Sequence, residues 1–66
     1  MAKRTDLQVH AYGSIFLLRP ISRRGWRWID MRISADRIEW AGAIVVEHRY
    51  VADVVRGAIA DGLQVR

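Results

Sequence analysis

The chain has 66 residues and no cysteine, and this absence limits how so short a sequence can stabilise a fold. Domains of this size bury only about 60% of the surface of the unfolded chain, and they commonly depend on disulfides, a metal ion or association with a partner. A disulfide, a thiolate metal site and a cysteine nucleophile are all excluded. We therefore expect one small domain that associates with itself as a homodimer.

The composition is typical of a folded protein, with 52% hydrophobic and 27% charged residues, three Trp and a single Pro. The longest apolar runs, 15–18 and 43–46, are far shorter than the roughly 20 residues that span a bilayer. The run near the N-terminus is also too short for a secretory signal peptide. These patterns predict a cytoplasmic protein that does not bind membranes.

The first third of the chain predicts an arm and a strand. Residues 1–8 are polar and have no hydrophobic period, so we expect a flexible N-terminal arm there and a single domain over 9–66. The all-apolar run within 13–19 predicts a strand. Pro20 ends it, because proline has no N–H to donate to a strand ladder.

The segment after Pro20 permits two interpretations. Ser22 is a suitable N-cap for a helix over 23–33, which is the interpretation that we predict. The alternative is a turn followed by a strand over 26–33, paired with the first strand. Within a helix, Trp26 and Trp28 cannot both lie in the buried stripe, because they are two residues apart. The pattern leaves open which of the two is buried.

The second half predicts strand structure and then a helix. Apolar residues between Ile38 and Val46 indicate either a tight hairpin at Ala41 and Gly42 or one strand with a bulge there. Helical spacing over 48–61 predicts the second helix. Its buried residues are expected to be Val51, Val54 and Ala58, packed against Ile15, Leu17, Ile44 and Val46.

The C-terminal end of this second helix carries a stop signal. Gly62 stands where a left-handed residue commonly ends a helix, and Leu63 can then fold back onto Ala58. Residues 63–65 are expected to form a short final strand.

The element order β-α-β(β)-α-β predicts an α+β domain with two layers. We expect a three- or four-stranded sheet with two helices packed on one face. The opposite face of the sheet is then uncovered. Because an uncovered apolar face is unfavourable in water, this architecture again predicts a homodimer or another partner.

Several blocks resemble a recurrent group of short proteins that we associate with bacteriophages and bacterial mobile elements. These blocks are Gly13-Ser14-Ile15, Leu18-Arg19-Pro20, Trp28-Ile29-Asp30, Gly42-Ala43, Asp61-Gly62-Leu63 and, as the most specific, Val45-Val46-Glu47-His48-Arg49-Tyr50-Val51-Ala52-Asp53. The resemblance covers 13–65 and implies a biological context rather than an activity. It favours the first helix, because the group carries helix formers in that segment. The basic residues within 23–27 depart from the group's pattern.

Residues for catalysis or for metal and cofactor binding are few. The two histidines, His10 and His48, lie in separate predicted elements, and no motif pairs them as metal ligands. Ser14, His48 and Asp53 are the only residues of the types found in a catalytic triad, and such triads are defined by geometry rather than by inventory. The five glycines form neither a phosphate loop nor a dinucleotide motif. We predict no catalytic residue, no metal and no cofactor.

Positive charge is concentrated between Arg19 and Arg32. This stretch contains five arginines and one carboxylate, Asp30, so it carries the whole net charge of +4. Guanidinium groups bind carboxylates and phosphates through paired hydrogen bonds, and Trp and Arg are enriched at binding hot spots. The predicted partner-binding residues are Arg19, Arg23, Arg24, Arg27, Trp28 and Arg32. The alternative is a solvated cationic face whose aliphatic stems cover apolar surface.

Together these features predict a non-enzymatic binding protein of phage or mobile-element type. It is expected to occupy an anionic surface on a host protein or nucleoprotein complex, as anti-CRISPR inhibitors do. One alternative is a small dimeric nucleic-acid-binding regulator. A second is a structural homo-oligomeric interaction module whose only partner is its own open sheet face.

Overall fold

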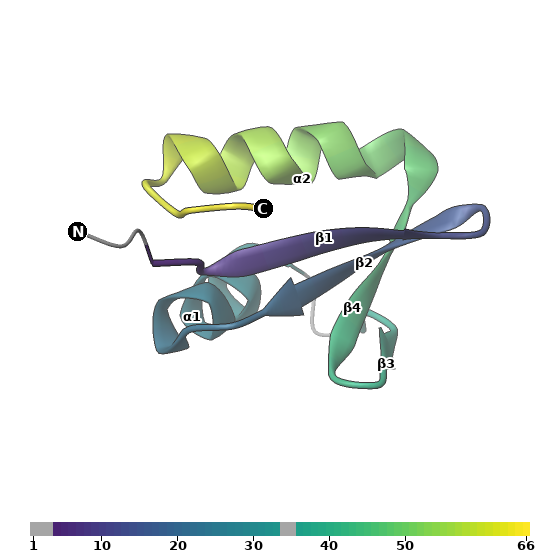
Figure 1. Ribbon diagram of the computed structural model, residues 1–66, viewed down its shortest axis with the longest axis horizontal. Coiled ribbons are helices and arrows are strands. Elements are labelled where there is room, and N and C mark those ends of the chain that lie inside the picture. The colour runs from purple at the N-terminus through teal and green to yellow at the C-terminus, as the bar shows by residue number, and fades with distance from the viewer. Residues whose placement is uncertain (1–3, 34–35) are drawn as a thin grey trace.

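The structure, a computed structural model, describes residues 4–33 and 36–66 (Figure 1). The elements are β1 (Leu7–Tyr12), β2 (Ile15–Pro20), α1 (Arg23–Arg32), β3 (Glu39–Trp40), β4 (Ala43–Glu47) and α2 (His48–Ala60). The strands form one antiparallel sheet in the order β1-β2-β4-β3. This architecture confirms the predicted α+β class with a four-stranded sheet.

Strand β1 is the main departure from the sequence-based expectation. It begins at Leu7, inside the predicted arm, and Leu7 and Gln8 pair with Pro20 and Arg19 of β2. The prediction of an arm is therefore wrong for these two residues, while residues 1–3 lie outside the described part of the chain. Leu7 is fully buried, and it is the only buried residue of β1. The strand therefore lacks the alternation of apolar and polar residues from which a strand is predicted.

Strand β2 and helix α1 agree with the predictions for that part of the chain. Pro20 is the last residue of β2. The hydroxyl of Ser22 accepts a hydrogen bond of 3.0 Å from the backbone N–H of Gly25, so Ser22 caps α1 as expected. The alternative strand over 26–33 is excluded, because these residues continue the helix to Arg32.

The β3–β4 connection is a tight hairpin rather than a bulged strand. Its two loop residues, Ala41 and Gly42, have positive φ angles of 52° and 77°. Positive φ at both central positions defines the hairpin turn whose twist matches that of antiparallel strands.

Helix α2 ends as its sequence predicts. Gly62 has a φ of 90°, and the N–H of Leu63 donates to the carbonyl of Ala58 at 3.0 Å. The expected final strand over 63–65 is reduced to one parallel bridge, in which Val65 lies beside Leu7. Figure 1 shows this C-terminal segment folding back from α2 toward β1.

Both helices pack on one face of the sheet and share a single core. Its buried members are Leu7, Leu18, Trp28, Ile29, Ile44, Val46, Ala58 and Leu63. Of the three α2 residues expected to be buried, only Ala58 is; Val51 and Val54 are half-buried and pack against the core. The expectation that Ile15 and Leu17 lie beneath α2 is wrong. Leu18 pairs with Ile44, and because side chains alternate along a strand, Leu17 then faces the other side.

Candidate functional site

A shallow groove of about 370 Å³ runs along α1. Its lining residues are Arg4, Arg23, Arg24, Arg27, Trp28, Met31 and Leu63. The five residues from α1 recur at spacings of three and four, so they occupy one side of the helix. Guanidinium groups surround an apolar floor, and we call this feature the arginine groove.

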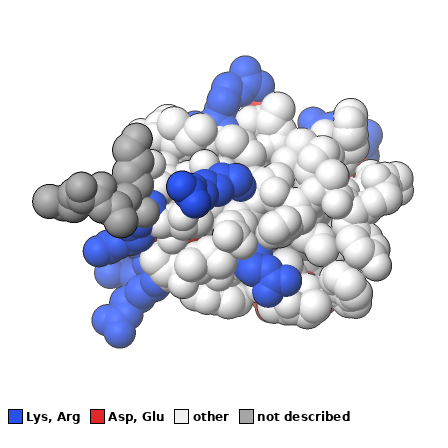
Figure 2. Space-filling model, in the orientation of Figure 1, with Lys and Arg blue, Asp and Glu red and all other residues white. Residues whose placement is uncertain are grey.

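Within the described residues, the cations of the arginine groove have no carboxylate at ion-pair distance, although the charge of Asp6 acts on Arg4 and Arg24. Among the described residues, Arg4, Arg23, Arg24 and Arg27 form no ion pair, whereas four other arginines pair with carboxylates. Those four are Arg32 with Asp61, Arg37 with Asp30 and Glu39, Arg49 with Glu47, and Arg56 with Asp53. Figure 2 shows basic side chains gathered at the end of the molecule where Figure 1 places α1.

Asp6 holds the segments that build the arginine groove. Its carboxylate accepts hydrogen bonds from the hydroxyl of Ser22 at 2.6 Å and from the backbone N–H of Gln64 at 2.9 Å. The Gln64 bond, followed by the Ser22 bond, lowers the pKa of Asp6, and Arg24 and Arg4 add to this lowering. The side chain therefore carries a stable negative charge while it links both chain termini to α1.

Trp28 lies between the hydrophobic core and the arginine groove, and it forms part of the groove floor. Only 8% of this residue is exposed, whereas Trp26 is 38% exposed, so Trp28 is the buried member of the pair. Its indole N–H donates to Asp61 at 2.7 Å, and the same carboxylate pairs with Arg32 at 3.1 Å. Trp28 is thus a core residue that also lines the groove, and its part in binding stays a prediction.

The structure separates the other two predicted site residues from the arginine groove. Arg32 lines a second hollow of about 340 Å³, beyond Trp28, where its charge is paired with Asp61. Arg19 pairs with Gln8 in the β1–β2 ladder and belongs to the sheet face opposite the helices. The basic stretch of the sequence therefore does not form one continuous surface.

Sequence reasoning missed Arg4 and Leu63 as groove residues, and Met31 was not among the predicted partner-binding residues. Arg4 was assigned to the flexible arm, and Leu63 only to the end of α2. The predicted packing of Leu63 onto Ala58 could have placed Leu63 near α1. No local sequence pattern indicates that Arg4 lies close to Leu63. Hydrogen bonds from Asp6 and Leu7 to the carbonyl of Gln64, at 2.9 and 3.1 Å, bring the two termini together.

Two of the three residues of triad type, His48 and Asp53, have other contacts. Asp53 accepts a hydrogen bond from Arg56 at 2.8 Å, and the ring of His48 packs against Phe16 at a centroid distance of 5.8 Å. Within residues 4–33 and 36–66, no three His, Asp or Glu side chains gather as metal ligands. In the same residues, neither helix has the length and hydropathy to cross a bilayer.

Comparisons with known proteins return no relative. No protein-family model matches the chain, and neither does a curated protein or a solved structure.

Proposed function

We propose that this protein is a non-catalytic binding module that docks the arginine groove onto an anionic surface of a host macromolecule. One observation carries the proposal. Four guanidinium groups that form no ion pair among residues 4–33 and 36–66 surround an apolar floor on a single side of α1.

The composition of the groove suits a partner that presents both charge and apolar surface. Guanidiniums form short, paired hydrogen bonds with carboxylates and phosphates. Met31 is 77% exposed beside these cations, and methionine adapts its shape to varied apolar partners. The net charge of +4 favours encounter with an anionic partner over long range.

The proposed context is a bacteriophage or mobile element acting in the host cytoplasm. The resemblance of residues 13–65 to short proteins of that origin supports it, as does the small size. In this context, occupying an anionic surface of a nucleoprotein complex, in the manner of an anti-CRISPR inhibitor, is the function that we propose. The partner is then a host protein or nucleoprotein.

Homodimerisation is a further part of the proposal. Ala52, Val55 and Ile59 recur at helical spacing on α2, where Val55 is half-buried and Ile59 is 56% exposed. Such a stripe packs readily against its own copy in a second chain. Light scattering at micromolar concentration should report twice the monomer mass of 7.6 kDa. A monomer throughout that range contradicts this part of the proposal.

Charge reversal tests the arginine groove. The test variant carries Arg23→Glu and Arg27→Glu, and Arg24 is left in place because its guanidinium lies against Gly62. The matched control carries Arg49→Glu and Arg56→Glu on α2, which gives the same change in net charge. Both variants should melt near the wild-type temperature, because exposed charges contribute less than about 1 kcal/mol each to folding.

The measurement is capture of host proteins from a bacterial lysate, with and without nuclease. We expect the wild type and the control to retain the same nuclease-resistant proteins, and the groove variant to lose them. Capture at wild-type strength by the groove variant would contradict the proposed function. Loss of all partners after nuclease treatment would instead favour the dimeric nucleic-acid-binding regulator.

A further inference from the structure

The sheet face opposite the helices carries two exposed aromatic rings. Tyr12 of β1 is 58% exposed and Trp40 of β3 is 52% exposed. Their ring centroids lie 5.4 Å apart at an interplanar angle of 48°. Since β1 and β3 are the two edge strands of the sheet, this contact spans its full width.

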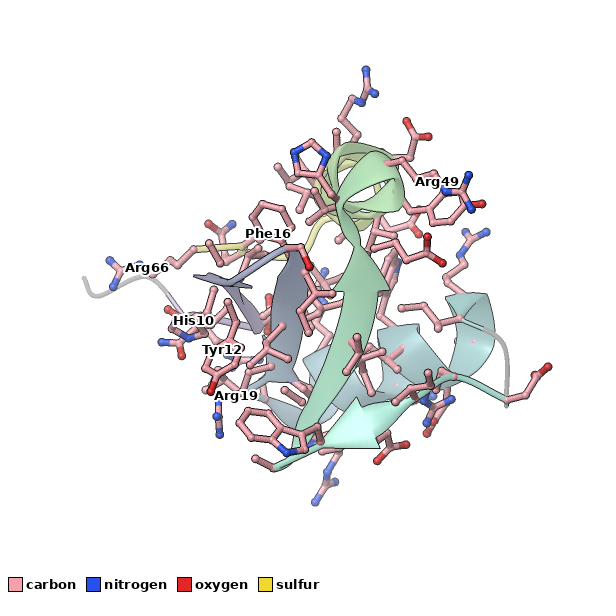
Figure 3. The ribbon with its side chains drawn as sticks, turned by 90° about the vertical axis from the view of Figure 1, so that its right-hand side faces the viewer. His10, Tyr12, Phe16, Arg19, Arg49 and Arg66 are labelled. Atoms are coloured by element: carbon pink, nitrogen blue, oxygen red, sulfur yellow. The ribbon has the colours of Figure 1, made fainter. Side chains whose placement is uncertain are left out.

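Strand register places both rings on the same face. Trp40 pairs with Ala43, and Ala43 shares a face with Val45, which pairs with Leu17. Leu17 in turn pairs with His10, which shares a face with Tyr12. Figure 3 shows His10, Tyr12 and Arg19 pointing away from both helices. We call the surface formed by His10, Tyr12, Arg19 and Trp40 the aromatic face.

Two buried residues, Leu17 and Ala43, share the aromatic face with the two rings. Leu17 is only 5% exposed and Ala43 is fully buried, yet neither belongs to the core shared with the helices. Side chains of the aromatic face therefore cover both residues. The contact between Tyr12 and Trp40 holds the two rings together, and about half of each residue stays open to solvent.

The charge on the aromatic face is positive. Arg19 is half-buried and has no ion pair among the described residues. The backbone oxygen of Arg66 accepts from the N–H of Val9 at 2.8 Å, so this arginine lies at the β1 edge of the sheet. By register, Glu47 is the carboxylate on this face, and it pairs with Arg49 at 3.3 Å.

This charge distribution favours an anionic ligand on the aromatic face over a second copy of the chain. A second copy docked through the same face would bring its Arg19 to a surface whose one carboxylate is already paired. An anionic occupant neutralises that charge instead. Exposed ring faces beside a cation match a ligand that offers both flat bases and phosphates.

We propose that the aromatic face binds single-stranded nucleic acid. Bases stack on Tyr12 and Trp40, and Arg19 binds a neighbouring phosphate. A duplex fits poorly, because its base faces are already stacked within the helix. The proposal is independent of the arginine groove, which lies on α1.

The test uses oligothymidylate and oligouridylate strands of about 12 nucleotides, within the site sizes of small single-strand binders. Fluorescence anisotropy measures their binding to the full chain. An abasic strand of equal length keeps the phosphates and removes the bases, and a duplex of equal length hides them. We expect the abasic strand and the duplex to bind at least about tenfold more weakly than the single strands.

Protein variants localise the binding site. Tyr12→Leu with Trp40→Leu keeps apolar side chains at both positions but removes both ring faces, whereas Tyr12→Phe with Trp40→Phe keeps them. The leucine pair should lose about tenfold or more in affinity, and the phenylalanine pair should stay within about threefold of wild type. Trp26→Leu, which removes an exposed tryptophan outside the aromatic face, should bind as the wild type does.

Several results would overturn the proposal. Equal affinity for the normal and abasic strands means that charge alone is recognised, and this comparison needs only the wild-type protein. If the folded Tyr12→Leu/Trp40→Leu variant binds as the wild type does, the nucleic acid binds elsewhere. If Arg23→Glu with Arg27→Glu then abolishes binding, the nucleic acid binds in the arginine groove. A leucine pair that turns a dimer into a monomer, in a protein that binds no strand, identifies a second copy as the occupant.

Discussion

The carboxylate of Asp6 accepts a hydrogen bond of 2.6 Å from the hydroxyl of Ser22, and that hydroxyl in turn accepts from the N–H of Gly25 in the first turn of α1. The other carboxylate oxygen accepts from the N–H of Gln64. One side chain thus joins the N-terminal segment, the start of α1 and the C-terminal segment. These three segments supply the walls of the arginine groove.

The Asp6 hydrogen bonds predict acid sensitivity. The bond from Gln64, followed by that from Ser22, holds the pKa of Asp6 below its ordinary value of 3.8. The folded state therefore binds this proton less readily than the unfolded state does. The associated stability is present above the unfolded pKa, and it is lost as the pH falls through the lowered pKa of the folded state.

Asp6→Asn should remove this acid sensitivity. The amide has one acceptor oxygen where the carboxylate has two, so it keeps only one of the bonds from Ser22 and Gln64 and sets its NH2 against the other donor. We therefore expect a loss of about 1 to 3 kcal/mol at neutral pH and a flatter stability profile in acid. Thermal melts between about pH 7 and pH 2 measure the profile. Asp53→Asn, an exposed carboxylate paired with Arg56, is the control and should follow the wild type. Parallel profiles for wild type and Asp6→Asn would disprove the assignment.

Two glycines in helices should respond oppositely to alanine. A Cβ on Gly25 would collide with the backbone carbonyl of Asp6, whereas a Cβ on Gly57 would meet only Trp28, at 3.7 Å. Gly25→Ala should therefore cost about 1 to 3 kcal/mol, and Gly57→Ala should gain up to about 1 kcal/mol from helix propensity. Urea denaturation compares the two. Equal stabilisation by both substitutions would show that α1 does not approach Asp6 this closely.

The two neighbouring tryptophans should differ in their effect on stability. Trp28→Ala leaves a cavity in the core and should cost about 3 to 5 kcal/mol. Trp28→Phe keeps most of the volume but loses the donor to Asp61, so we expect a loss of about 1 to 3 kcal/mol. Trp26→Ala is the matched control and should cost less than Trp28→Ala in the same thermal melts. The reverse order would assign the core position to Trp26.

The β3–β4 turn offers a stabilising substitution. Ala41 has a φ of 52°, a conformation that alanine adopts at a cost and asparagine tolerates better. Ala41→Asn should raise stability by up to about 1 kcal/mol. Gly42→Ala, at a φ of 77°, should lower it by a similar amount. Differential scanning calorimetry measures the melting temperatures of both variants. A lower melting temperature for Ala41→Asn would contradict the positive φ of Ala41 in this turn.

Short-range signals in the sequence were sufficient for much of the secondary structure. Ser22 marked the start of α1, Gly62 marked the end of α2, and Ala41 with Gly42 marked the turn between β3 and β4. Each signal acts through residues only a few positions away. For the same reason, the α+β class and the helix that carries Arg23, Arg24 and Arg27 could be predicted from the sequence.

Contacts between distant segments were decided only by the tertiary structure. The start of β1 depends on Leu7 pairing with Pro20, and the choice between Trp28 and Trp26 depends on how α1 rotates against the sheet. The arginine groove is complete only because Asp6 and Gln64 bring Arg4 and Leu63 together from opposite ends of the chain. Such contacts join residues far apart in the chain, so they leave no periodic pattern in the sequence. Their free energy is gained only when the whole core forms.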